Sequence, residues 1–204
     1  MKNIILSVNP HIVIYSEKGI ENYIQIENKI NQILKNQIQK QAPFIYYESI
    51  LSHKQSTSAV YIRAILPKES PSAEKLNALI TPKNALVNLS SQTPSIILGK
   101  ELSKNLNVIV GDTVNLMQFD KQNSTIKNQP LIVAGILNIG ISQYDKQYGL
   151  MDFNLAQKLF GTPNWSSGIE LNLNSPSQAL NVAAQLETKF NLTQYQKYGI
   201  DFRA

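Results

Sequence analysis

The sequence has no cysteine among its 204 residues and only two histidines, His11 and His53. Without cysteine there is no disulfide framework, no thiolate metal ligand and no thiol nucleophile. Neither histidine has a His, Asp or Glu partner at metal-ligand spacing, such as i, i+4 on a helix. The sequence therefore predicts no metal site and no cofactor.

Charged residues are also few, at 16% of the chain, and the net charge is +5. A basic protein binds nucleic acid or an anionic surface when its cations are concentrated in one run or patch. Here Lys18, Lys29 and Lys35 are interleaved with Glu21 and Glu27, a pattern typical of a solvated helix face. The sequence therefore argues against a nucleic-acid partner.

Long hydrophobic runs are missing as well. The longest are Ile4–Val8 and Ile12–Tyr15, far below the ~20 residues that a membrane-spanning helix needs. The N-terminus lacks the apolar region and cleavage motif of a signal peptide. Neither end of the chain carries a polar tail, and we expect such a sequence to be a piece of a longer protein.

Catalytic signatures are absent. No serine lies in a Gly-x-Ser-x-Gly elbow. Gly99-Lys100-Glu101 lacks the glycine-rich lead and the Ser/Thr of a phosphate loop, and Gly135–Gly140 lacks the third glycine of a dinucleotide fingerprint. The sequence therefore predicts no catalytic residue and no enzyme. A soluble small-molecule-binding protein stays open as an alternative, and it would need a polar cleft around Glu48, His53 or Asp145.

The first third of the chain has a β-α-β-β pattern. A strand is predicted at Pro10–Ser16, broken at Lys18-Gly19, and an amphipathic helix follows over Ile20–Gln39. The β-branched and aromatic segments Phe44–Leu51 and Ala59–Leu66 flank a polar turn, which predicts a hairpin.

After the proline-containing segment Pro67–Ser72, the composition changes, which indicates a crossing between subdomains. The middle of the chain is rich in strand patterns with short helices. The end again reads as strand, amphipathic helix and strand, at Ser167–Leu173, Ala179–Phe190 and Leu192–Lys197. We therefore predict an α+β fold in which residues 1–66 and 166–204 form one discontinuous subdomain and residues 67–165 form an inserted, mostly β subdomain.

The segment Ser95–Leu137 predicts a strand, a short helix, a Gly111-Asp112 turn and two strands that flank a polar hairpin tip at Asp120–Gln129. A solvated loop of this length is ordinary. The tip nevertheless carries Ile126 and Lys127, with Phe119 at its base and Lys121 beside it. An exposed isoleucine between two lysines suits an acidic partner with an apolar groove, so these four residues are candidates for partner binding.

Five segments in this order resemble one family: PHIVIYS, SIILGKELSKNLNVIVGDTVNL, PLIVAGIL, QYDKQYGLMDFNLAQKLFG and SGIELNLNSPSQA. Together they cover nearly the whole chain and resemble the periplasmic domain of the LolC/LolE permeases, within the MacB-type, FtsX-like class. The resemblance implies a porter-like α+β subdomain with an inserted β-rich Sabre subdomain. It also implies a parent protein with four transmembrane helices, in which this domain lies between the first two.

The same resemblance implies a function. The parent would be the inner-membrane subunit of the lipoprotein-releasing ABC transporter, with this domain facing the periplasm. Its partners would be a second permease subunit, a cytoplasmic ATPase, the lipoprotein cargo and the periplasmic carrier LolA. Phe119–Gln129 corresponds to the carrier-binding Hook of LolC-type subunits, whereas QPLIVAGIL and Tyr144-Asp145 are more similar to LolE. We therefore expect a LolE-like subunit, with a MacB-like efflux permease as the alternative.

Overall fold

The computed structural model describes residues 10–120, 125–190 and 199–202. Along the chain the elements are β1 (Ile12–Glu21), α1 (Tyr23–Leu34), the 3-10 turn η1 (Lys35–Gln37), β2 (Ile38–His53), β3 (Ser56–Ile65), α2 (Ala73–Ala78), β4 (Ile80–Thr81), β5 (Ser95–Gly99), α3 (Lys100–Leu106), β6 (Thr113–Asp120), β7 (Thr125–Leu137), α4 (Ser142–Asp145), β8 (Tyr148–Asp152), α5 (Phe153–Phe160), β9 (Trp165–Leu173), η2 (Pro176–Gln178), α6 (Ala179–Lys189) and β10 (Gly199–Phe202). The α+β class predicted from the sequence is confirmed.

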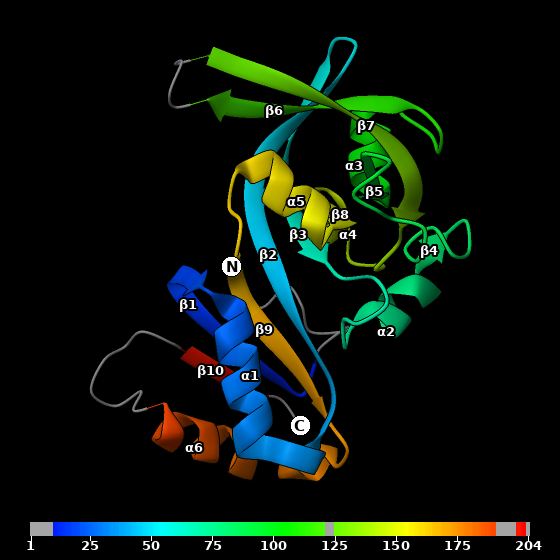
Figure 1. Cartoon of the computed structure of the whole chain (residues 1–204). Coiled ribbons are helices and arrows are strands. Elements are labelled where there is room, and N and C mark those ends of the chain that lie inside the picture. The colour runs from blue at the N-terminus through cyan, green and yellow to red at the C-terminus, as the bar shows by residue number, and fades with distance from the viewer. Residues whose placement is uncertain (1–9, 121–124, 191–198, 203–204) are drawn as a thin grey trace.

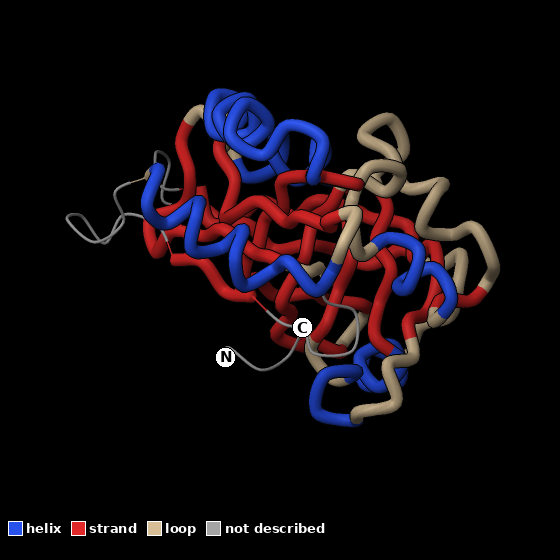
Figure 2. Tube along the Cα trace, turned by 90° about the horizontal axis from the view of Figure 1, so that it is seen from below, coloured by secondary structure: helices blue, strands red, loops and turns tan. Residues whose placement is uncertain are grey.

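All strands belong to one hydrogen-bonded system. Their order is β10-β1-β9-β2-β3-β8-β5-β7-β4, and β6 pairs with both β7 and β2. Because of this double pairing, the strands β2, β3, β8, β5, β7 and β6 close into a ring. Figure 1 shows this ring in the upper part of the molecule, which we call the barrel end. In Figure 2 the strands fill the centre and the helices lie around them.

The other end of the molecule, the helix-backed end, consists of β10, β1, β9 and the first half of β2, covered by α1 and α6 (Figure 1). Alternating residues of β1 and β9 face the two helices, because successive side chains of a strand point to opposite faces. The buried side chains of this core include Ile12, Ile14, Ile30, Leu34, Ile169, Leu171, Val182 and Leu186. Gly168 allows β1, β9 and β2 to approach closely, since a Cβ there would lie 2.8 Å or less from the Phe44 ring.

The barrel end has a core of its own. Its buried side chains include Ile45, Leu51, Ile62, Ile96, Leu98, Val114, Leu116, Leu131 and Val133 from the strands and Leu102, Leu106 and Phe153 from α3 and α5. Every residue of β5 and of β8 is buried. This burial explains why both strands appear in the sequence as short continuous apolar runs without alternation.

β2 joins the two ends. Its first half pairs with β9, from Ile38 to Phe44, and its second half pairs with β3, from Phe44 to His53. At 16 residues it is much longer than the usual strand of about five or six residues. The division predicted at residues 67 and 165 stays a prediction. None of the helices in the described part of the chain combines the length and hydrophobicity needed to cross a membrane.

Several predicted boundaries were wrong. β1 does not break at Lys18-Gly19 but continues to Glu21 through a register shift, with Gly19 at φ 76°. The first helix ends at Leu34 because Lys35 adopts a left-handed φ of 46°, and Ile38 already begins β2. The last predicted strand, Leu192–Lys197, lies outside the described residues, and the final described strand is β10.

Candidate functional site

The β6–β7 hairpin is the element that the sequence singled out for partner binding. Its backbone ladder runs from Thr113 opposite Ile132 to Asp120 opposite Thr125. The predicted polar loop over 120–129 is therefore wrong in extent, because β7 already begins at Thr125. The polar residues of Thr125–Gln129 can still pair with β6, because strands that lie beyond the core are held by backbone hydrogen bonds and need no apolar face to bury.

The base of the hairpin is fixed to the barrel end. β6 pairs with β2 only between Asn115 and Met117, so the hairpin extends beyond this contact (Figure 1). Gln118 Nε2 donates a hydrogen bond of 2.9 Å to the Leu159 carbonyl of α5. Ser49 Oγ donates another of 2.9 Å to the Met117 carbonyl. These contacts hold the base, while the end of the hairpin projects from it.

The structure brings two of the four candidate residues into register. Phe119 and Ile126 are backbone partners across the ladder, and the Ile126 side chain is 60% exposed. Lys127 is exposed and stands opposite Gln118. Lys121 lies outside the described residues, and the Phe119 side chain is not described. Whether these residues bind a partner therefore stays a prediction.

The outer face of the sheet beside this hairpin carries further exposed isoleucines. Ile50 on β2 is 45% exposed and Ile132 on β7 is 43% exposed. Their strand neighbours Leu51, Leu131 and Val133 point inward and are fully buried. Ile50 stands opposite Met117 of β6 and Ile132 opposite Thr113, so the two are spread along the sheet, and single exposed hydrophobic side chains of this kind are ordinary on a protein surface. The sequence analysis identified only Ile126 among them.

A second group of polar residues lies between the two ends of the molecule. Arg63 on β3 and Glu170 on β9 are both buried and form an ion pair, with Nη2 of Arg63 2.9 Å from each carboxylate oxygen. Arg63 Nη2 also donates to Ser72 Oγ at 2.9 Å, and Ser70 Oγ donates to Glu170 Oε1 at 3.1 Å. The network therefore connects β3, β9 and the segment Pro67–Ser72.

Two opposing effects act on the pKa of Arg63. Burial is the largest single effect and opposes the charge of Arg63, but the Glu170 carboxylate together with Tyr46 and Tyr148 outweighs it, and the pKa of Arg63 is raised well above its usual value. Burial also raises the pKa of the neighbouring phenols Tyr46 and Tyr148, which therefore stay neutral. The sequence analysis missed the pair. The sequence did carry a signal for it, because Arg63 and Glu170 are single charged residues within two otherwise apolar predicted strands. A fully buried charged side chain needs a partner of opposite charge.

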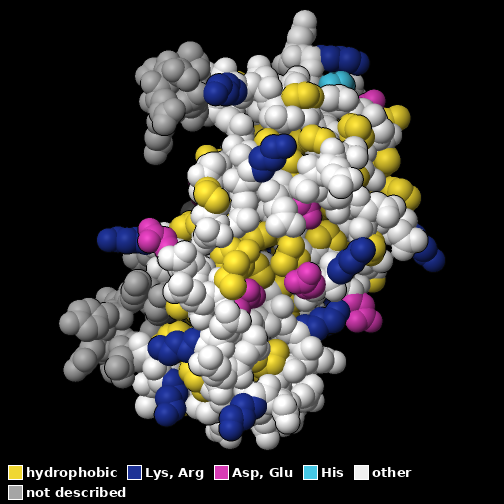
Figure 3. Space-filling view, viewed as in Figure 1, with side chains coloured by type: hydrophobic (Ala, Val, Ile, Leu, Met, Phe, Trp, Pro, Cys, Tyr) yellow, Lys and Arg dark blue, Asp and Glu magenta, His cyan; other side chains and the backbone are white. Residues whose placement is uncertain are grey.

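A third set of residues lies on α1, at the surface between the two ends of the molecule. The Tyr23 ring contacts Phe153 of α5 edge-on, with 5.5 Å between centroids. One turn along the helix, the half-buried Glu27 carboxyl has a pKa raised to about 7, mainly by burial and further by the Glu69 carboxylate, against a hydrogen bond from Gln41. Figure 3 shows acidic side chains beside an exposed apolar area in the middle of the molecule.

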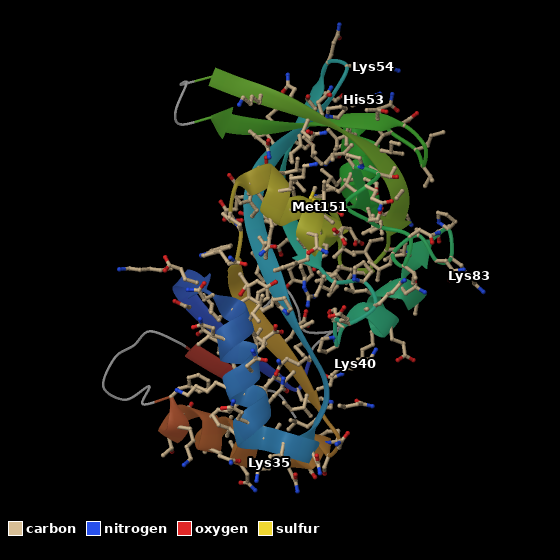
Figure 4. All side chains as sticks on the ribbon, in the orientation of Figure 1. Lys35, Lys40, His53, Lys54, Lys83 and Met151 are labelled. Atoms are coloured by element: carbon tan, nitrogen blue, oxygen red, sulfur yellow. The ribbon has the colours of Figure 1, made fainter. Side chains whose placement is uncertain are left out.

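The residues that a small-molecule site would need do not converge. His53 lies at the tip of the β2–β3 hairpin (Figure 4), with Nδ1 3.1 Å from the Leu106 carbonyl. Asp145 is buried and accepts hydrogen bonds from the backbone of Ile139 and Gly140, at 3.0 and 3.2 Å. Glu48 is exposed on β2. In residues 10–120, 125–190 and 199–202, no group of three or more His, Asp or Glu side chains could hold a metal ion.

Comparisons with known proteins give the chain its relatives. No protein family model matches it. The transmembrane protein LolE of the Haemophilus influenzae lipoprotein-releasing system is 25% identical over 188 residues, which are 87% of this chain and 44% of that protein. The LolC protein of Xylella fastidiosa is 26% identical over 157 residues, 74% of this chain and 37% of LolC. The chain thus spans less than half the length of these two relatives.

The fold has solved counterparts. The periplasmic region of MacB from Actinobacillus actinomycetemcomitans superposes with a TM-score of 0.63 at 14% identity, covering 99% of this chain and 92% of that one. The structural match extends over nearly the whole chain and so includes both ends of the molecule. Over most of its length the chain is therefore similar in sequence to part of LolE and of LolC, and its fold is similar to that of the MacB periplasmic region.

Proposed function

We propose that this chain is the periplasmic domain of an inner-membrane subunit of a lipoprotein-releasing ABC transporter. The observation that carries the proposal is the match to LolE over 87% of the chain, which runs through both ends of the fold. In this function the domain has no chemistry of its own. It receives the movement that a cytoplasmic ATPase partner drives, and it acts on lipoproteins leaving the membrane together with a second permease subunit.

Within this function, the β6–β7 hairpin is the candidate contact for the soluble carrier LolA. Ile126 is the anchor, with Phe119 as its ladder partner and Lys121 and Lys127 as the cations that favour an acidic partner surface. The segments QPLIVAGIL and Tyr144-Asp145 favour a LolE-like subunit over a LolC-like one.

The test is a titration of this domain with the purified lipoprotein carrier of the same organism, by NMR or calorimetry at low and moderate salt. A docking hairpin gives saturable micromolar binding that Ile126→Asp abolishes. Ile24→Asp is the matched control, because Ile24 is 50% exposed on α1 at the helix-backed end. Such binding would make the subunit LolC-like in its role. No binding at a few hundred micromolar, weaker than roughly −5 kcal/mol, would leave the LolE-like assignment and remove the docking role from the hairpin.

The MacB fold match supports a second candidate, an efflux permease. This candidate differs in gene structure, because a MacB-like parent carries its own ATPase domain with a phosphate loop. Sequencing the parent gene separates the two. A separate ATPase gene favours lipoprotein release, and a fused ATPase domain favours efflux.

A further inference from the structure

His11 stands where the chain enters the sheet, one residue before β1. Its side chain is half-buried, and its Nδ1 atom lies 2.9 Å from the backbone amide of Leu173, the last residue of β9. A backbone amide can only donate, so the Nδ1 atom must accept this hydrogen bond. The ring that makes this bond is therefore neutral and carries its proton on Nε2.

This ring takes the place of a strand carbonyl. The ladder between β1 and β9 begins with Ile12 opposite Leu171, so the Leu173 amide lies beyond its last pair. The imidazole supplies the acceptor for that amide. The His11 backbone amide adds bonds to the Leu171 carbonyl, at 2.9 Å, and to Asn172 Oδ1, at 3.2 Å. Together these bonds fasten the start of β1 to the end of β9.

The other histidine of the chain has the opposite requirement. His53 Nδ1 lies 3.1 Å from the Leu106 carbonyl, and a carbonyl oxygen can only accept, so this Nδ1 atom must donate. Protonation of the His53 ring adds a proton at Nε2 and leaves that bond in place. Protonation of the His11 ring adds a proton at Nδ1, directed at the Leu173 N–H, and so removes the bond. Of the two histidines, His11 is therefore the one whose contact depends on the charge of its ring.

We propose that His11 is a pH-sensitive staple, which holds the start of β1 to the end of β9 while its ring is neutral and releases this contact when the ring is protonated. The staple also reaches the segment Pro67–Ser72, because Asn172 Nδ2 donates to the Pro71 carbonyl at 3.4 Å. It does not depend on the proposed transport function.

The surroundings of the ring favour its neutral form. Burial lowers the pKa of His11, and the Lys75 ammonium of α2 lowers it further. The strands that adjoin this end of β1 carry the charged residues Glu170 on β9, Lys40 on β2 and Asp201 on β10. Of these, Glu170 is already bound by Arg63. Because the pKa of His11 lies below its usual 6.5, the native state binds the proton less tightly than the unfolded state. The contribution of the staple to the free energy of unfolding is therefore complete above pH 6.5 and is lost as the pH falls through the lowered pKa.

The test is an NMR pH titration of the 204-residue chain with nitrogen-labelled histidine. At neutral pH the ring nitrogens should show the Nε2–H form for His11 and the Nδ1–H form for His53. As the pH falls, the His11 ring should titrate with a midpoint below 6.5, and the Leu173 amide resonance should shift with the same midpoint. An Nδ1–H form of His11 at neutral pH, or a Leu173 amide that does not respond while His11 titrates, would overturn the staple.

Amide hydrogen exchange at Leu173 supplies the second readout. After correction for intrinsic exchange, this amide should exchange several-fold faster at pH 5 than at pH 7.5 in the wild type. His11→Asn places a carbonyl oxygen near the position of Nδ1 and cannot take up the proton, so it should remove the difference. His53→Asn is the matched control and should leave the difference unchanged. A His11→Asn variant that kept the wild-type pH dependence would refute the proposal, and the wild-type titration decides it if this variant does not fold.

Discussion

Removing one partner of the Arg63–Glu170 pair should be among the most damaging single changes in this domain. Glu170→Gln keeps the shape of the side chain but leaves the Arg63 guanidinium buried without its counter-charge. Both side chains are nearly inaccessible, at 3% and 0% exposure. Breaking such a buried pair from one side typically costs about 3–5 kcal/mol of folding stability.

The expected size of the loss in folding stability follows from the contacts of the Glu170 carboxylate. Glu170 receives two bonds of 2.9 Å from Arg63 and one of 3.1 Å from Ser70, so its loss leaves several donors in a buried site. For a chain of this length, each kcal/mol shifts the unfolding midpoint by about 2–4 °C, so the midpoint should fall by roughly 6–20 °C. Thermal and urea unfolding followed by circular dichroism measure both quantities.

A double substitution separates the contribution of the charges to folding stability from the contribution of side-chain packing. Arg63→Met with Glu170→Leu replaces both charges by apolar groups of similar length, and we expect it to be clearly less damaging than either single change. Glu101→Gln is the control, because its partner Lys104 is 60% exposed and the pair is solvated. If Glu170→Gln changed stability no more than Glu101→Gln, or if the double variant showed the sum of both losses, our account of the junction would be refuted.

Three further predictions concern other parts of the fold. The raised pKa of Glu27 means that its carboxyl binds a proton more tightly in the native state than in the unfolded state. Its contribution to the free energy of unfolding is therefore complete below pH 4.5 and is lost as the pH rises to about 7. In urea unfolding, the free energy of unfolding of the wild type should fall by about 1 kcal/mol more than that of Glu27→Gln over this interval, after allowance for solvent screening. Gly168→Ala should cost about 1–3 kcal/mol in the same assay, since the new Cβ would meet the Phe44 ring and the Ile14 carbonyl; an unchanged midpoint would contradict the close approach. Asp152→Ala should cost about 1 kcal/mol, because its side chain caps α5 through a 2.9 Å bond from the Leu155 amide, and Asp152→Asn should recover most of that loss.

The sequence predicted best where burial and spacing agree. β5 and β8 are short, fully buried and largely apolar segments, and both belong to the ring. The prediction of α1 ran too far because Ile38 continues the helical spacing, yet tertiary pairing with Leu173 draws it into β2. The outer part of β7 was missed because Thr125–Gln129 carries almost no apolar residues.

The polar junction was beyond sequence reasoning for a different reason. Arg63 and Glu170 are 107 positions apart, and only the fold shows that they face one another. Periodicity identifies which face of an element is buried, but it does not identify which elements meet. Of the hairpin, by contrast, Ile126 could be found because one apolar residue stood in a polar segment.

The position of the Arg63–Glu170 pair explains why the molecule needs it. At Phe44 the backbone ladder of β2 changes partner, from Gly168 of β9 to Ile65 of β3. Arg63 is the ladder partner of Tyr46, and Glu170 is the ladder partner of Ala42, two residues to either side of this point. The ion pair therefore links β3 and β9 across β2 at the point where the pairing of β2 passes from one of these strands to the other, and it joins the barrel end to the helix-backed end.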